Sequence, residues 1–346
     1  MRSRLFNTRV AVGIALAVVL ALAAGWLALE QWLAAPMTID AERVRIEIPR
    51  GQPFAVTARE LARRGVLDHP QLLAVYARLE GADARIRAGE YDIPRGTSPR
   101  QLLVLLESGV VVRRSITIVE GWTFRDLRRV LEKDPSLVQT LAGQDDAAVM
   151  RALGEPALVP EGLFFPDTYL YDKGTTDLVI LRKARARMRA ELDAAWNSRA
   201  EGLPLRSAYE ALVLASIVEK ETALPSERPR IAGVFTERLR SGMRLQTDPT
   251  VIYGLGPAFD GNLRRSDLER DGPYNTYTRT GLPPTPIAMP GAASLAAAVR
   301  PDVRGEIYFV ATGLPDGGHE FSRTLAEHER AVARYLRRYR QQGTGH

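Results

Sequence analysis

The longest apolar run of the chain lies near its beginning. Residues 10–29 carry no charged side chain, and a helix of that length is long enough to cross a bilayer. Arg2, Arg4 and Arg9 precede the run, and acidic residues follow it. By the positive-inside rule, we expect a cytoplasmic tail at 1–9 and the rest of the chain on the opposite side of the membrane. A cleaved signal peptide is the alternative, but its apolar segment is usually shorter.

A pattern of strands and helices follows a predicted linker, 30–43. Strands are predicted at 44–48 and 88–93, and helices at 55–64, 70–79 and 98–106, the last with Ser98 as its N-cap. The order strand, helix, helix, strand resembles in topology a LysM-like module, a small fold that binds N-acetylglucosamine polymers. We assign this module to 44–110. A structural spacer is the alternative.

The next part of the chain, 111–204, is predicted to connect this module to the last domain. We expect a strand at 115–119 and helices at 124–131, 134–156 and 177–196. Between the last two helices, the run from Glu161 to Tyr169 is rich in aromatic residues and bounded by Gly and Pro. Such a composition predicts a loop or short strand that is able to line a groove. For Phe164 and Phe165, packing in the core is the competing interpretation.

The last predicted domain, 205–342, contains an apolar run that ends abruptly in charge. From Ala211 to Val218, apolar residues follow helical spacing on two faces, so we expect a helix that is buried on both sides. The sequence Glu219-Lys220-Glu221-Thr222 then places carboxylates at the edge of a core. Burial disfavours an ionised carboxyl and raises its pKa, as a general acid near neutral pH requires. The alternative is a helix end whose charged side chains meet water.

Two polar segments farther along the chain have the residues expected at a sugar-binding surface. One is the short run from Gln246 to Gly254, and the other is a long irregular loop from Tyr274 to Ile287 that contains several prolines. Loops of this length in a compact domain are usually functional, and Pro lowers the entropy lost on binding. Aromatic rings, amides and hydroxyls bind sugars, so the candidate substrate-binding residues are Gln246, Thr247, Asp248, Tyr253, Tyr274, Asn275, Thr276, Tyr277 and Pro283.

Composition narrows the classes of function. The 346 residues are 45% hydrophobic and 25% charged, which is typical of a folded protein with two or three domains. The net charge of +6 suits a polyanion or a lipid surface, but the arginines are dispersed, so nucleic acid is not an expected partner. The chain has no Cys, which excludes disulfides and thiolate nucleophiles, and its four His are not at metal-ligand spacing. We therefore expect neither a metal site nor a cofactor.

Several long motifs resemble those of the YceG-like family of endolytic peptidoglycan transglycosylases. They are the run Leu245 to Gly254, Tyr274-Asn275-Thr276-Tyr277, Gly281-Leu282-Pro283-Pro284, Ser216 to Thr222 and the late strand Tyr308-Phe309-Val310. The resemblance covers nearly the whole chain and implies an α+β protein with a transmembrane helix, a LysM-like module and a mixed α+β catalytic domain. It also implies a single-pass protein of the cell inner membrane with a periplasmic catalytic domain. Peptidoglycan strands are its implied substrate, and penicillin-binding proteins and other wall-synthesis proteins its implied partners.

The family cleaves the strand between N-acetylmuramic acid and N-acetylglucosamine without water, which implies a single carboxylic acid. That acid protonates the leaving oxygen and then, as a carboxylate, accepts the proton of the C6 hydroxyl, which closes a 1,6-anhydro ring. Cleavage of nascent strands in this way is expected to terminate glycan elongation. On a helix, Glu219 and Glu221 point in different directions, so only one can face the cleft. The Glu-Thr pair at Glu221 matches the acid of lytic transglycosylases, so Glu221 is the first choice and Glu219 the second.

Two other classes of function stay open. A non-catalytic scaffold would hold the wall-synthesis machinery near glycan, and it would not need an acid at a buried helix end. An inverting glycosidase would need Asp248 across the cleft to activate water. We expect instead that Asp248 starts a helix and caps its backbone N–H groups. His319 either binds substrate or is a turn residue that contacts backbone, and we favour the turn.

Overall fold

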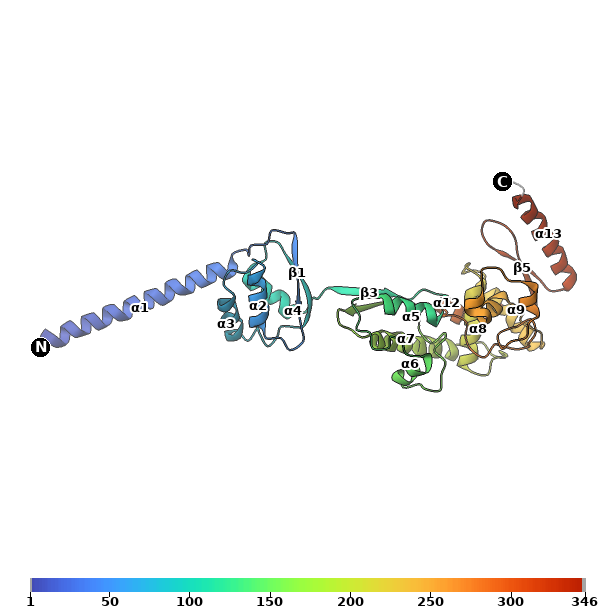
Figure 1. Cartoon of the computed structure of the whole chain (residues 1–346), viewed down its shortest axis with the longest axis horizontal. Coiled ribbons are helices and arrows are strands. Elements are labelled where there is room, and N and C mark those ends of the chain that lie inside the picture. The colour runs from blue at the N-terminus through green and yellow to red at the C-terminus, as the bar shows by residue number, and fades with distance from the viewer. Residues whose placement is uncertain (1, 344–346) are drawn as a thin grey trace. The chain divides into compact units, whose positions relative to one another are not determined.

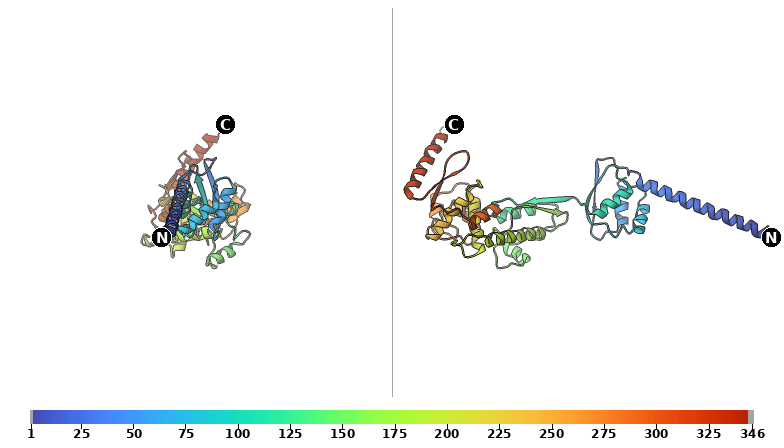
Figure 2. Two further views of the ribbon diagram at one scale, coloured as in Figure 1. Left: turned by 90° about the vertical axis from the view of Figure 1, so that its left-hand side faces the viewer. Right: turned by 180° about the vertical axis from the view of Figure 1, so that it is seen from behind.

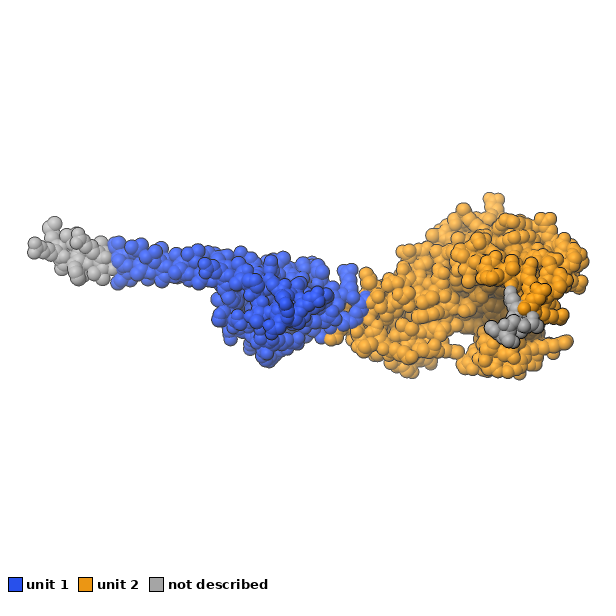
Figure 3. All heavy atoms as spheres, turned by 90° about the horizontal axis from the view of Figure 1, so that it is seen from above, with its two compact units in different colours: residues 1–114 blue, residues 115–346 orange. Residues whose placement is uncertain are grey.

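The structure is a computed structural model that describes the backbone of residues 2–343 and the side chains of residues 12–341. The chain forms two compact units that divide between Arg114 and Ser115, shown in two colours in Figure 3. Within residues 2–343, helices predominate, and the strands form three separate two-stranded sheets. The mixed α+β class expected from the sequence is confirmed.

The first unit begins with one long helix, α1 (Arg2–Ala34). Within it, the 23 residues Val12–Ala34 are apolar enough and long enough to cross a membrane. The helix continues past the predicted span, so the linker predicted at 30–43 is wrong in its first part. Leu33 is fully buried in the core of this unit, Leu29 and Trp32 pack against it, and Arg100 binds Glu30 at 2.7 Å. The helix continues because its last turn covers the unit.

The rest of the first unit has the predicted order of strand, helix, helix and strand, which Figure 1 shows around β1. Its elements are β1 (Arg43–Ile48), α2 (Phe54–Arg63), α3 (Pro70–Leu79), β2 (Gly89–Pro94) and α4 (Pro99–Ser108). The two strands pair antiparallel, from Arg43 opposite Pro94 to Ile48 opposite Gly89. A capping box between Ser98 and Gln101 starts α4, as the sequence predicted for Ser98. The likeness to a LysM-like module stays a prediction.

The second unit begins with a two-stranded sheet and helices α5 to α7. Its elements are β3 (Arg113–Thr117), α5 (Phe124–Lys133), α6 (Asp146–Leu153), β4 (Thr168–Asp172) and α7 (Asp177–Asn197), and β3 pairs with β4. The helix predicted at 134–156 is wrong except for α6. The carboxylate of Asp177 accepts hydrogen bonds from the backbone N–H groups of Thr140 (3.0 Å) and Leu141 (2.9 Å). These amides are therefore satisfied by a side chain, and the segment stays a loop.

Helix α8 (Ala208–Glu221) is the centre of the second unit. All eight residues from Ala211 to Val218 are buried, as predicted for a helix with two apolar faces. Around it lie α7, α9 (Arg228–Arg240), α10 (Asp248–Leu255) and α12 (Ala292–Val299). One core includes both Phe164 and Leu212, so the predicted division at 204/205 does not separate two compact units. Phe164 and Phe165 are buried in this core.

The C-terminal part completes the unit with a hairpin and a helix. The short helices η1 (Gly256–Ala258) and α11 (Arg265–Glu269) follow α10, and β5 (Tyr308–Ala311), β6 (His319–Ser322) and α13 (Leu325–Gly343) follow α12. The hairpin pairs Tyr308 with Ser322 and Ala311 with His319. Helix α13 packs against this hairpin, as Figure 1 and the right-hand view of Figure 2 show. The hairpin brings His319 back towards the end of α8.

Because the last turn of α1 packs in the core of the first unit, the stability of a truncated chain should depend on where the truncation ends. We expect a chain that starts at residue 28 to keep the stability of this unit. The additional substitution Leu33→Ala should destabilise it by about 2–5 kcal/mol, because it empties a fully buried site. Hydrogen–deuterium exchange of the α4 amides in the two chains measures the difference. Equal exchange rates would show that the last turn of α1 is not part of the core.

Candidate functional site

The three charged residues at the end of α8 point to three different places. Glu219 accepts hydrogen bonds from Arg228 Nη2 and from the backbone N–H of Gly291, both at 2.9 Å. Lys220 is exposed, and its Nζ donates to the carbonyl of Gly121 at 3.2 Å. Glu221 accepts a hydrogen bond from the hydroxyl of Thr247, 2.6 Å from its Oε2. The helical rotation between neighbouring residues separates the two carboxylates, as the sequence predicted.

Glu219 is fully engaged in structural contacts. Its side chain is only 4% exposed, and its partner Arg228 is also nearly buried. Gly291 is the N-cap of α12, so its backbone N–H has no acceptor within that helix. By accepting this hydrogen bond, Glu219 connects α8 to the start of α12. Glu219 therefore connects two helices, and both of its carboxylate oxygens already accept hydrogen bonds from the protein.

Glu221 is in the environment that a general acid requires. Most of its side chain is surrounded by protein, and a small part reaches solvent. Burial raises the pKa of the Glu221 carboxyl, and the hydrogen bond from Thr247 partly opposes that rise. Charges on His319 and Arg238 also lower this pKa, whereas Asp248 raises it. Because burial is the largest contribution, Glu221 keeps its proton to a higher pH than an exposed Glu.

Thr247 is held in place by the two polar segments that the sequence singled out. Its backbone N–H donates to Thr276 Oγ1 at 3.1 Å, and the hydroxyl of Thr250 donates to its carbonyl at 2.8 Å. Just before it, Gln246 donates its N–H to the carbonyl of Thr276 and has a φ of 50°. Left-handed backbone is uncommon for a non-glycine residue and occurs often at functional sites. The turn at Gln246 aims the Thr247 hydroxyl at Glu221.

Asp248 is exposed and starts α10, but the predicted capping role is wrong. The hydroxyl of Tyr277 donates to Asp248 Oδ1 at 2.6 Å, and α10 begins at N-cap Thr247 without a side-chain cap. The Thr247 hydroxyl is already bound to Glu221, so it is not available as a cap. Burial, together with the Asp248 carboxylate, raises the pKa of Tyr277, which therefore stays a hydrogen-bond donor.

Asn275 organises the loop that carries Tyr277. Its side-chain amide donates to the carbonyls of Asp267 (3.2 Å), Leu268 (3.0 Å) and Arg270 (2.7 Å), and its Oδ1 accepts from the N–H of Tyr277. Asn275 and Thr276 are both buried. With Pro283, they form part of the wall of a small cavity of about 280 Å³. Their clearest role is to place Tyr277 and Thr247.

A larger cleft of about 990 Å³ lies next to these residues, along α10 and the start of α5. It is lined by Tyr253 and Tyr274, whose rings meet edge to face at 4.9 Å between centroids, and by Lys220. Glu221 is not part of this wall. The candidate residues therefore lie in three places: around Glu221 (Gln246, Thr247, Asp248, Thr276 and Tyr277), along the larger cleft (Tyr253 and Tyr274), and at the small cavity (Asn275 and Pro283).

The wall of the larger cleft contains a buried acid, Glu161. This residue was not among the candidates predicted from the sequence. Only 5% of it is exposed, and it accepts hydrogen bonds from the backbone N–H of Phe124 at 3.0 Å and from the Tyr253 hydroxyl at 3.1 Å. Burial raises the pKa of Glu161 to about 7. The signal for this residue was a lone carboxylate before the apolar run Gly162–Phe165.

His319 contacts a carboxylate, so the predicted contact with backbone is wrong. Its Nδ1 and its backbone N–H each lie 2.8 Å from an oxygen of Glu227. Arg238, also not selected from the sequence, is buried and donates to the carbonyls of Ile307 (2.7 Å) and Leu245 (2.5 Å). Both side chains act electrostatically on Glu221. Together they complete a polar site around the end of α8.

Comparison with known proteins identifies the family. The model of the YceG-like family matches residues 46–334, so the chain belongs to the YceG-like family. An endolytic murein transglycosylase of Bacillus subtilis is 32% identical over 85% of each chain. A protein of the same name from Streptococcus pneumoniae is 26% identical over 91% of this chain and 63% of its own length. A crystal structure of a yceG-like protein from Listeria monocytogenes is 29% identical, with a TM-score of 0.52 over 84% of this chain and 98% of that one.

Glu161 predicts a pH dependence of stability. In the unfolded chain its carboxyl ionises near pH 4.5, whereas in the folded protein it stays protonated to about pH 7. Between pH 4.5 and 7, Glu161 is ionised in the unfolded chain but protonated in the folded one. A rise in pH over this range therefore favours the unfolded state, and the stability that is present below pH 4.5 is lost. Relative to Glu161→Gln, the wild-type free energy of unfolding should fall by on the order of 3 kcal/mol over this range. Urea denaturation at a series of pH values measures it, and parallel curves for the two proteins would contradict it.

Proposed function

We propose that this protein is a membrane-anchored endolytic lytic transglycosylase that cuts nascent peptidoglycan strands between N-acetylmuramic acid and N-acetylglucosamine. The names of its relatives support the reaction class. The observation that carries the proposal is the position of Glu221, a largely buried acid held by Thr247 at the edge of the core. Its products would be strands with 1,6-anhydro-N-acetylmuramic ends.

Glu221 supplies both proton transfers of this reaction. Its protonated carboxyl donates to the glycosidic oxygen as the bond from that oxygen to C1 breaks, and positive charge develops on the muramic ring. The resulting carboxylate accepts the proton of the C6 hydroxyl while O6 bonds to C1. Thr247 binds Oε2 throughout, which leaves Oε1 to exchange the proton with the sugar. Proton, leaving group and nucleophile are then all accounted for without water.

Asp248 is the nearby carboxylate that a hydrolase would require. It is close enough to Glu221 to raise the pKa of that acid, and Tyr277 binds one of its oxygens at 2.6 Å. We assign it to orienting Tyr277 and the substrate rather than to activating water. The adjoining exposed side chain of Gln246 provides a further polar contact for a sugar. An inverting hydrolase with Asp248 as base is the enzyme class that this assignment opposes.

The remaining parts of the chain suit an enzyme that works close to a membrane. The length and composition of the span Val12–Ala34 support a single-pass anchor, which we assign to the inner membrane. We place the N-terminus in the cytoplasm and the catalytic unit in the periplasm, where cutting a growing strand terminates its elongation. The first unit, as a LysM-like module, would bind glycan. Penicillin-binding proteins and other wall-synthesis proteins are the proposed partners.

A non-catalytic scaffold is the second candidate function, and the site opposes it. A scaffold gains nothing from a buried carboxylic acid, because burial of an ionisable group costs stability. Here such an acid lies beside Thr247, Asp248 and Tyr277, and part of it reaches solvent. An activity measurement on strands without any partner protein separates the two candidates.

The two glutamates at the end of α8 should show opposite phenotypes. Glu221→Gln should lower the rate of strand cleavage by at least 10²–10⁴-fold without loss of stability, because an amide cannot transfer the proton. Glu219→Gln should keep most turnover but lose on the order of 3 kcal/mol of stability, because it breaks the buried pair with Arg228. Cleavage of purified peptidoglycan and urea denaturation measure the two effects.

The pH dependence gives this assignment a further check. Glu221 must start the reaction protonated, so the rate should fall as the pH rises above its pKa. Near-normal turnover in Glu221→Gln, with an inactive but stable Glu219→Gln, would reverse the two roles. No cleavage by the wild-type protein under conditions in which it binds strands would favour the scaffold.

A further inference from the structure

The larger cleft contains charged side chains of both signs. The cations in its wall are Arg125, Arg128, Arg129 and Lys220, and the acids are Asp126, Glu132, Asp146 and Glu161. Whether this wall attracts an anion depends on which of these groups are already paired.

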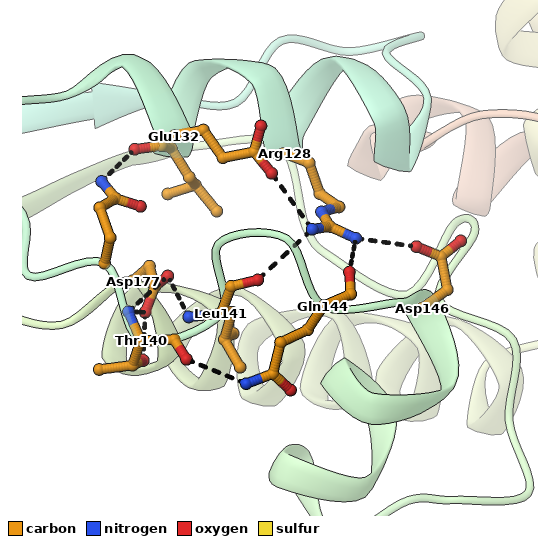
Figure 4. Close-up of polar contacts among 9 residues, drawn as sticks. Arg128, Glu132, Thr140, Leu141, Gln144, Asp146 and Asp177 are labelled. Carbon is orange, nitrogen blue, oxygen red and sulfur yellow. Dashed lines mark hydrogen bonds and ion pairs between the residues drawn. The ribbon is translucent and has the colours of Figure 1, made fainter.

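Two of the four cations are committed to structural partners. Arg128 donates to Glu132 at 3.1 Å, to Asp146 at 3.3 Å and to the carbonyl of Gln144 at 2.6 Å, and Figure 4 shows these contacts converging on its guanidinium. Arg129 binds Asp126 at 3.1 Å. Three of the four acids are therefore paired with these two arginines, which balance two of their three negative charges.

Arg125 and Lys220 remain available for a ligand. Both are exposed, and within the described part of the chain neither has a carboxylate within ion-pair distance. Within the described part of the chain, the hydrogen-bond partner of Lys220 is the carbonyl of Gly121. The fourth acid, Glu161, is buried and bound by Phe124 and Tyr253, with a pKa of about 7 that leaves it partly neutral. The cleft thus offers two cations without an acidic partner, set against one unbalanced negative charge among the paired groups and the partly neutral Glu161.

The rest of the wall is largely aliphatic. Besides Thr123, three aromatic residues and two glycines, it contains Val159, Pro160, Pro249, Ile252, Leu255, Pro257 and Ile287. Val159 is 48% exposed there, so its side chain presents apolar surface to a ligand. A ligand with carboxylates and small apolar groups would satisfy both parts of this wall.

Helix α10 connects the cleft with the acid. Thr247 and Asp248, at its start, lie at Glu221, whereas Ile252, Tyr253 and Leu255 line the cleft. An eight-residue helix is about 12 Å long, and four extended residues span about 13 Å. A short peptide attached to the sugar at Glu221 therefore reaches the cleft.

We propose that this cleft binds the acidic stem peptide of the N-acetylmuramic acid residue at Glu221, with Arg125 and Lys220 as its carboxylate partners. Stem peptides contain alanine methyl groups and carboxylates, which match the aliphatic wall and the two free cations. This inference rests on the proposed function, because it takes peptidoglycan as the substrate. It assigns to the enzyme a preference for strands that still carry their peptides.

Binding to an inactive full-length chain tests the proposal independently of catalysis. In the Glu221→Gln background, in detergent micelles, the Kd is measured for uncrosslinked strands with stem peptides and for the same strands after an amidase has removed them. Peptide-bearing strands should bind more tightly. Arg125→Gln and Lys220→Gln should each raise their Kd by about tenfold, as expected for one lost charge-assisted hydrogen bond, and should leave the Kd of stripped strands unchanged.

Arg129→Gln is the matched control, because it removes the same charge from a cation that already has a partner. It should change the Kd of peptide-bearing strands less than twofold. Equal Kd values for the two strand types, or an equal effect of all three substitutions, would overturn the peptide site. Those results would leave the proposed function intact, whereas wild-type protein that cleaves neither strand type would contradict the proposed function itself.

Discussion

The hydrogen bond from Thr247 to Glu221 is the interaction on which the site depends. It joins the end of the buried helix α8 to the start of α10, and it holds a carboxyl group where burial raises its pKa. The bond uses the hydroxyl that would otherwise cap α10, and a left-handed residue, Gln246, sets its direction. Thr250, Thr276 and Asn275 then serve to keep Thr247 and Tyr277 in place.

The two glutamates of α8 illustrate how one short motif separates structure from chemistry. Glu219 neutralises Arg228 and binds the backbone before α12, so its charge stabilises the fold. Glu221, half a turn further on, has a neutral hydroxyl as its hydrogen-bond partner and part of its surface in solvent. Pairing with a cation would lower the pKa of a carboxyl group, which would then be ionised and unable to donate a proton. A hydroxyl partner carries no charge and allows the carboxyl to stay protonated. This contrast supports Glu221 as the acid.

Local pattern predicted most helices, because burial and capping are encoded by near neighbours. α3 begins and ends at the predicted residues, and Ser98 caps α4. The failures came from distant contacts. Asp177 satisfies amides 36 and 37 positions away, so 134–144 is not helical, and Glu161 meets Tyr253 across 92 positions. Glu227 and His319 are also 92 positions apart. The family motifs indicated Glu221 and Thr247, but the roles of Glu161, Arg238 and Glu227 required the fold.

The central claim is that one acid, Glu221, moves both protons and that the C6 hydroxyl is the nucleophile. Cleavage of purified peptidoglycan in H₂¹⁸O, followed by mass spectrometry of the new ends, tests it most directly. The account predicts 1,6-anhydro-N-acetylmuramic ends that carry no ¹⁸O. Reducing ends labelled at C1 as the main product would contradict it and would assign Asp248 the activation of water.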